Sequence, residues 1–138
     1  MNWKLSAGLS ALFAGMTAIL AKIGIENVPT NVAMLVRTCV VVVCAGGLVM
    51  FRGEGGAFKE ISNKSWLFLA LSGIATGLSW LFYFSALKEG KVQQVAPIDK
   101  LSFVIAMLLA FVFLHEKAKP TTIAGAGLIV CGVLLTLI

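Results

Sequence analysis

The sequence VAPIDKLSFVIAMLLAFVFL, residues 95–114, decides the fold because its length and its charges together fit one kind of structure. Its uninterrupted apolar part, residues 101–114, covers only about 21 Å as an α-helix. A bilayer core is about 30 Å thick, so this part is too short to cross it. Starting the helix near residue 95, with Pro97 in its first turn, restores about 30 Å. The stretch is therefore predicted to be a transmembrane helix that takes Asp99 and Lys100 below the interface.

Similar apolar segments fill most of the rest of the chain. Of the 138 residues, 59% are hydrophobic and 12% are charged, whereas an ordinary soluble domain carries roughly a quarter charged residues. The further segments of transmembrane length run over about 5–21, 31–51, 66–87 and 121–138. We therefore expect an all-α integral membrane protein, a single domain over residues 1–138 with about five transmembrane helices.

The positive charges predict how the helices are oriented. Five spans put the two termini on opposite faces of the membrane, and basic residues are enriched on the cytoplasmic side. The face with the N-terminus carries Lys4, Arg52, Lys59, Lys64, Lys117 and Lys119, whereas the other carries Lys22, Lys88 and Lys91. This bias predicts a cytoplasmic N-terminus. Because the basic residues flank apolar runs and form no concentrated patch, a nucleic-acid partner is not expected.

The ionisable residues within the spans are the main candidates for a functional site. Arg37 is about 9 Å into the second helix and Asp99 about 6 Å into the fourth, counted from the same membrane face. Lys100 adjoins Asp99, and Lys22 ends the first helix on that side. Charges at membrane depth usually face a bundle interior or a wet cavity, where they pair or meet a substrate. The alternative is that Arg37 and Lys100 extend to the interface and Asp99 neutralises one of them.

Aromatic and small residues add two weaker signals. Trp80 and Tyr83 are one turn apart and deep in the third span, where they either wall a pocket or pack in the bundle. Glycine and alanine recur in the first, third and fifth spans, and such spacings allow close helix contacts in lipid. The same residues are also common in membrane helices generally, so both explanations stay open.

The sequence contains no pattern typical of an enzyme. It has no nucleophile and base constellation, Gly-rich phosphate loop or cluster of metal ligands, and its one histidine, His115, falls in a short turn. The three cysteines all lie in apolar runs without paired spacing. We therefore expect neither catalysis nor a metal or other cofactor.

Two stretches resemble a known family. They are SALKEGKVQQVAPIDKLSFVIAMLLAFVFLHEKAKPTTIAGAGLIVCGVLL, residues 85–135, and LFAGMTAILAKIGIENVPTNVAMLVRTCVVVV, residues 12–43. The pattern is similar to a single repeat of the EamA-like family in the drug/metabolite transporter superfamily. A polar turn after "AL", a proline near the next helix start, Glu116 after a long apolar run and a Gly-rich last helix carry the likeness.

The resemblance implies a secondary transporter of the inner (plasma) membrane. Most relatives carry two oppositely oriented five-helix repeats with the substrate path between them, so a single repeat implies a homodimer, parallel or antiparallel. The distantly related small multidrug resistance proteins use a glutamate in the first helix, but this chain has no acid there, which leaves Asp99 as the embedded carboxylate that would carry protons.

The candidate site suggests what such a transporter would carry. Arg37, Lys22 and Lys100 outnumber the one embedded acid, Asp99, so a small metabolite with an anionic group, such as an amino acid or organic acid, is favoured. Trp80 and Tyr83 complete the candidate substrate-binding residues. Besides this substrate, the expected partners are membrane lipids and a second copy of the chain. A lipid-linked sugar flippase subunit and a non-transporting membrane scaffold protein are the alternatives.

Overall fold

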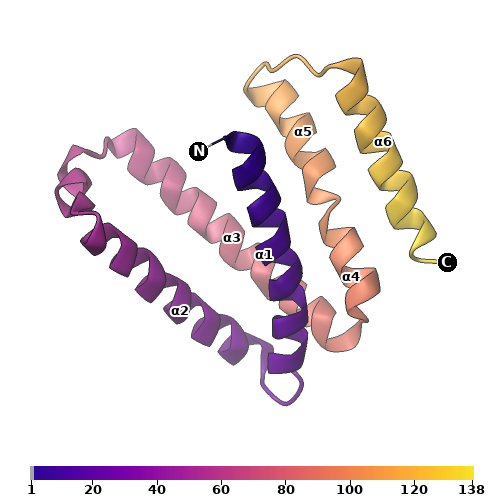
Figure 1. The fold of residues 1–138 in the computed structure, drawn as a ribbon, viewed down its shortest axis with the longest axis horizontal. Helices are drawn as coiled ribbons and strands as arrows, with labels where there is room; N and C mark the ends of the chain where they lie inside the picture. The colour runs from indigo at the N-terminus through magenta and orange to yellow at the C-terminus, as the bar shows by residue number, and fades with distance from the viewer. Residues whose placement is uncertain (1) are drawn as a thin grey trace. The chain divides into compact units, whose positions relative to one another are not determined.

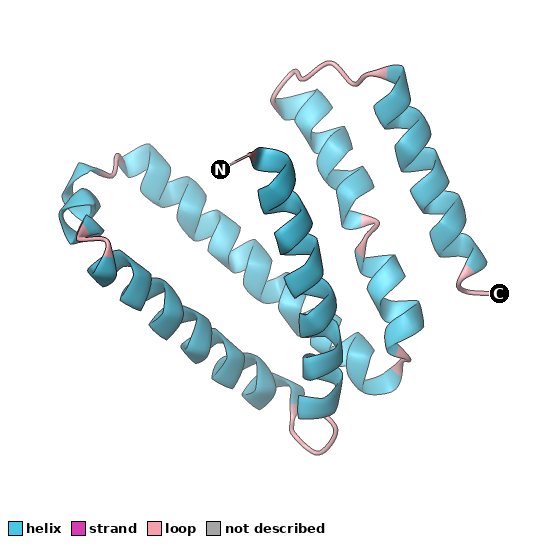
Figure 2. Ribbon diagram, viewed as in Figure 1, coloured by secondary structure: helices cyan, strands magenta, loops and turns pink. Residues whose placement is uncertain are grey.

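The computed structural model describes residues 2–138, which form helices joined by short connections, with no strand among them (Figure 1; Figure 2). The expected all-α fold is confirmed. Its elements are α1 (Trp3–Gly24), α2 (Thr30–Phe51), the 3₁₀ helix η1 (Glu54–Glu60), α3 (Asn63–Glu89), α4 (Val92–Asp99), α5 (Ser102–Phe113) and α6 (Pro120–Leu135).

Most of these helices have the length and composition of membrane spans. α1, α2, α3 and the α4–α5 pair, Val92–Phe113, are each long and apolar enough to cross a membrane, and α6 is a shorter apolar helix. The 16 residues of α6 cover about 24 Å. Large apolar side chains are exposed around these helices, among them Val43 and Leu128. A helix that is apolar all round suits a lipid environment, so lipid would cover these surfaces.

The chain forms two compact units. One, the α2–α3 unit, consists of Leu20–Lys88, and the other, the α4–α6 unit, consists of the residues up to Ile19 together with Glu89–Ile138. The boundary at Ile19 falls within α1, so this helix contributes to both units. Each predicted site residue can therefore be assigned to one unit.

The α2–α3 unit is an antiparallel helix pair that η1 connects at one end (Figure 1). Pro29 precedes α2, where its fixed φ suits a helix start and its missing N–H is not needed. Gly53 has a φ of +67°, a left-handed conformation that glycine adopts without strain, and it separates α2 from η1. At the opposite end, Ile25 and Leu87 are fully buried and fix the turn between α1 and α2 against the end of α3.

The α4–α6 unit contains a discontinuous span, which differs from the continuous helix expected over residues 95–114. The helix begins earlier, at Val92, and is interrupted at Lys100 and Leu101. Pro97 lies inside α4 and not in a first turn, so it cannot donate the backbone hydrogen bond that a helix needs there. The N–H groups of Lys100 and Leu101 instead donate to carbonyls three residues back, at 3.0 and 2.9 Å. This tight 3₁₀ geometry separates α4 from α5.

Several hydroxyl groups within the spans are satisfied by their own helices. Thr38 Oγ1 donates to the carbonyl of Met34 at 2.8 Å, and Thr76 Oγ1 donates to the carbonyl of Ser72 at 2.9 Å. Unsatisfied polar groups are costly in hydrocarbon, so these bonds let hydroxyls face lipid. The charged side chains of the spans need partners other than their own backbone, and their contacts define the candidate site.

Candidate functional site

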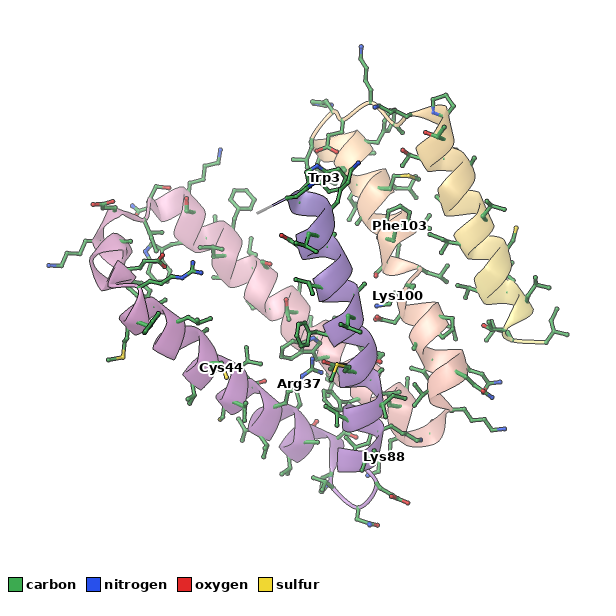
Figure 3. The ribbon with its side chains drawn as sticks, in the orientation of Figure 1. Trp3, Arg37, Cys44, Lys88, Lys100 and Phe103 are labelled. Carbon is green, nitrogen blue, oxygen red and sulfur yellow. The ribbon has the colours of Figure 1, made fainter. Side chains whose placement is uncertain are left out.

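Arg37 lies on α2 at a depth where a charge needs a partner. It follows the start of the helix at Thr30 by seven residues, about 10 Å along the axis. Its side chain is partly buried, in contrast to the exposed apolar side chains of Val36 and Val40 on α2. Figure 3 shows Arg37 in the space between α2 and α3. The neighbouring helix therefore supplies its contacts.

Two aromatic rings of α3 form a platform for the Arg37 guanidinium. The guanidinium carbon lies 4.3 Å from the ring centroid of Trp80 and 5.4 Å from that of Phe84. Trp80 and Phe84 are four residues apart, so they lie on the same face of α3 about one turn from each other. We call this pair the aromatic shelf. A cation over such rings is stabilised by about 0.5–2 kcal/mol, the higher figure applying where water is excluded.

The aromatic shelf is itself held in place by packing. Phe84 is buried, with 2% of its surface exposed, and its ring meets that of Tyr83 edge to face at a centroid distance of 6.5 Å. Tyr83 also has a further interaction within the chain. The rings are therefore positioned by their own helix and by the buried end of the unit, so the guanidinium rests on a fixed surface.

A guanidinium over aromatic rings remains able to bind an anion. Its N–H donors lie in the plane of the group and match the two oxygens of a carboxylate or phosphate. Among residues 20–88, no carboxylate forms an ion pair with Arg37. The arrangement is thus suited to a ligand with a planar anionic group, held at membrane depth beside aromatic side chains.

Lys22, near the end of α1, contacts the end of α3. Its Nζ donates to the backbone carbonyl of Leu87, near the end of α3. Lys88 makes a similar contact in the opposite direction, donating from Nζ to the carbonyl of Val28 at 3.3 Å. Lysines commonly satisfy the last carbonyls of a helix. The two lysines therefore join the α1–α2 turn to α3, which stabilises the end of the unit nearest the aromatic shelf.

Asp99 and Lys100 form a local ion pair at the break between α4 and α5. Lys100 Nζ lies 3.5 Å from Asp99 Oδ2, and the two side chains retain 61% and 37% of their surface exposed, respectively. The geometry places this pair in the α4–α6 unit, whereas Arg37, Trp80, Tyr83 and Lys22 belong to the α2–α3 unit. Asp99 and Arg37 thus each have a partner within their own unit.

One residue of the site was missed in the sequence analysis. Phe84 carries half of the aromatic shelf, yet it is one of nine phenylalanines in the chain and has no polar atom to single it out. Its position four residues after Trp80 was the available signal, because that spacing puts both rings on one helix face. The sequence analysis applied the same helix-face argument to Trp80 and Tyr83, which are three residues apart.

Comparisons with known proteins agree with the helical architecture. The chain matches the EamA-like transporter family over residues 1–138. It is 43% identical over 134 residues to an uncharacterized transporter in the cobO 3′ region of a Sinorhizobium species, covering 97% of this chain and 95% of that protein. It is 25% identical over 127 residues to the uncharacterized protein MJ1333.1 of Methanocaldococcus jannaschii, covering 92% and 90% of the two chains.

A longer relative matches only in part. The uncharacterized transporter YojE of Bacillus subtilis is 24% identical over 90 residues, which are 65% of this chain but 30% of that protein. No solved structure matches the chain. The fold and the family are thus supported by sequence and by the helices described above.

Proposed function

This chain belongs to the EamA-like transporter family, and on that premise we propose that it is one subunit of a secondary transporter that moves a small anionic metabolite. As a multi-pass membrane protein of half size for its family, it offers one five-helix repeat. The observation that carries the proposal is the Arg37 guanidinium on the aromatic shelf, about 10 Å into a membrane span.

The substrate is proposed to be an amino acid, an organic acid or a similar carboxylate. A carboxylate would accept two parallel hydrogen bonds from the Arg37 guanidinium, and charge-assisted bonds of this kind are about twice as strong as neutral ones. Trp80 would contact the adjacent part of the substrate, since its ring lies 4.3 Å from the guanidinium carbon. Asp99 is proposed to take up or release a proton, exchanging Lys100 for another partner when it does so.

The working unit is proposed to be a homodimer in the inner (plasma) membrane, with each N-terminus in the cytoplasm. Transporters built from paired repeats bind their substrates near the repeat interface and expose them by rocking one half against the other. A second copy would supply the second repeat, in parallel or antiparallel orientation. The glycines of α1, α3 and α6 are open to a partner, because a Cβ built on any of them meets no atom within 4 Å.

A ligand-dependent thermal-shift screen on the purified dimer tests the proposed substrate class. A ligand that binds only the folded state raises the unfolding temperature, by an amount that grows with its concentration relative to Kd. We expect at least one small carboxylate to stabilise the wild-type protein and to lose its effect in Arg37→Gln. The matched control is Arg52→Gln, which removes an exposed arginine outside the spans.

The alternatives make different forecasts in the same experiment. A lipid-linked sugar flippase subunit would be stabilised by an isoprenoid phosphate and not by any soluble acid. A scaffold protein would respond to neither class of compound. Cysteine cross-linking through Gly127→Cys or Gly132→Cys would test the dimer separately, because α6 is the proposed contact between copies. A protein that stays monomeric in lipid nanodiscs would contradict the homodimer.

A further inference from the structure

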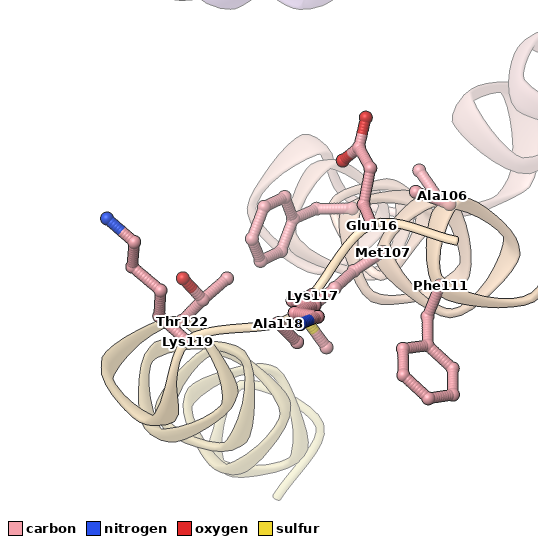
Figure 4. Close-up of a pocket in the computed structure, with 10 residues that line it drawn as sticks. Ala106, Met107, Phe111, Glu116, Lys117, Ala118, Lys119 and Thr122 are labelled. Atoms are coloured by element: carbon pink, nitrogen blue, oxygen red, sulfur yellow. The ribbon is translucent and has the colours of Figure 1, made fainter. Parts of the chain in front are cut away.

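A groove separates α5 from the start of α6, within the α4–α6 unit, whereas the aromatic shelf belongs to the α2–α3 unit. It encloses about 540 Å³. Its residues on α5 share one face of that helix, and the others belong to the following loop and the first turn of α6. They are Phe103, Ala106, Met107, Ala110, Phe111, Glu116, Lys117, Ala118, Lys119 and Thr122. Figure 4 shows Met107 and Phe111 on α5, and Lys119 and Thr122 across the groove from them.

The groove has an apolar wall and a charged rim. The wall residues of α5 recur at intervals of three and four, the spacing of a single helix face. Their rings are accessible, since Phe103 and Phe111 retain 45% and 59% of their surface exposed. The rim carries two lysines, Lys117 and Lys119, and one acid, Glu116, so it has a net charge of +1. Thr122, in the first turn of α6, adds a hydroxyl group to the lining.

The dimensions of the groove match one leaflet of a bilayer. Phe103 precedes Phe111 by eight residues, about 12 Å along α5. One leaflet contributes about half of a 30 Å hydrocarbon core, or roughly 15 Å. The charged rim begins directly after α5 ends at Phe113. The groove therefore extends from the level of lipid headgroups to a depth that an acyl chain reaches.

We propose that this groove is a binding site for an anionic glycerophospholipid, which stays bound as a component of the folded protein. The lipid phosphate would lie against Lys117 and Lys119, and one acyl chain would cover Phe103 and Met107. Glu116 opposes the phosphate and limits the affinity. Basic pockets between membrane helices are a recognised means of binding anionic headgroups. The lipid would fill the space between α5 and α6 and hold these two helices together.

Native mass spectrometry of protein released from nanodiscs tests this site. The nanodiscs would contain phosphatidylethanolamine and phosphatidylglycerol in equal amounts. We expect wild-type protein to retain one phosphatidylglycerol per chain, and Lys117→Gln with Lys119→Gln to lower this retention by roughly tenfold, as expected for two lysines near an anionic headgroup. Glu116→Gln, which removes the opposing charge, should raise it.

A matched double variant separates a site from general surface charge. Lys59→Gln with Lys64→Gln removes the same charge from η1 and the start of α3, outside the groove. We expect it to retain phosphatidylglycerol as the wild type does. Equal losses in the two double variants, or equal retention of both lipids by the wild type, would overturn the proposal. The proposal would also be overturned if the groove variants changed only the monomer–dimer equilibrium, because a second copy of the chain would then occupy the groove.

Discussion

Arg37 and Lys100 are both cations inside membrane spans, yet they are accommodated in different ways. Arg37 rests on two rings of another helix, at 4.3 and 5.4 Å, and is partly buried. Lys100 lies at a helix break and pairs with its sequence neighbour Asp99, with 61% of its side-chain surface exposed. The first arrangement fixes a charge through tertiary structure, and the second pairs it only with its sequence neighbour. A membrane charge therefore indicates a site most strongly when a different element positions it.

The largest effect is expected from removing the Arg37 charge. Arg37→Gln should reduce transport by at least about tenfold, because a charge-assisted hydrogen bond contributes about 1.5–3 kcal/mol. Arg37→Lys should not restore it, since an ammonium lacks the planar donor pair and stacks less well. Uptake or counterflow in proteoliposomes would measure both variants. Wild-type transport by Arg37→Gln would show that Arg37 only extends to the interface.

Removing half of the aromatic shelf should have the next largest effect. Trp80→Ala loses the nearer ring and leaves Arg37 without its closest contact, at an expected cost of about 0.5–2 kcal/mol for the lost cation–π interaction. Trp80→Phe keeps a ring and should retain most of the transport. Unfolding temperature and counterflow should be measured together for both variants. Equal transport by Trp80→Ala and Trp80→Phe would show that Arg37 functions without the aromatic shelf.

A smaller and more selective effect is expected at the helix break. Asp99→Asn removes one partner of a pair whose side chains are substantially exposed, so stability should change by less than about 1 kcal/mol. Transport should lose any dependence on pH, because the proposed proton carrier is gone. Rates measured across a pH series in proteoliposomes would show this. An unchanged pH profile would exclude Asp99 as the proton carrier.

The smallest effect is expected at Lys100 itself. Lys100→Gln leaves Asp99 and the backbone of the break unchanged, and it removes only a largely exposed ammonium. Stability and transport should both remain within about twofold of wild type, as for most exposed ion pairs. Lys91→Gln, at the start of α4, is the matched control. A loss at Lys100 as large as that at Arg37 would remove the contrast between the two cations.

The architecture could be predicted from the sequence because the length and apolar composition of a segment identify a membrane span. Periodicity could not reveal the break at Lys100 and Leu101, since Pro97 was compatible with either the first turn or the interior of a helix. The Asp99–Lys100 pair was predictable from adjacency alone. The contact of Arg37 with Phe84 was not, because it depends on how α2 and α3 face each other across 47 residues of sequence.

The groove between α5 and α6 was likewise beyond sequence analysis. Its lysines were assigned only to membrane orientation, and the matching face of α5 is apolar like every other face of that helix. Helix packing decides which apolar side chains contact a neighbouring helix and which line an open space. Composition carries little information about that packing in a membrane, where lipid and protein are equally apolar.

The central claim is that the Arg37 guanidinium binds a substrate carboxylate, and a double-mutant cycle with the ligand tests it most directly. The measurement compares Kd for a stabilising acid and for its uncharged amide, in the wild type and in Arg37→Gln. We predict that loss of the ligand charge weakens wild-type binding by about tenfold or more and leaves the variant nearly unaffected, so that the two changes are strongly coupled. Equal weakening in both proteins would place the carboxylate elsewhere and contradict the claim.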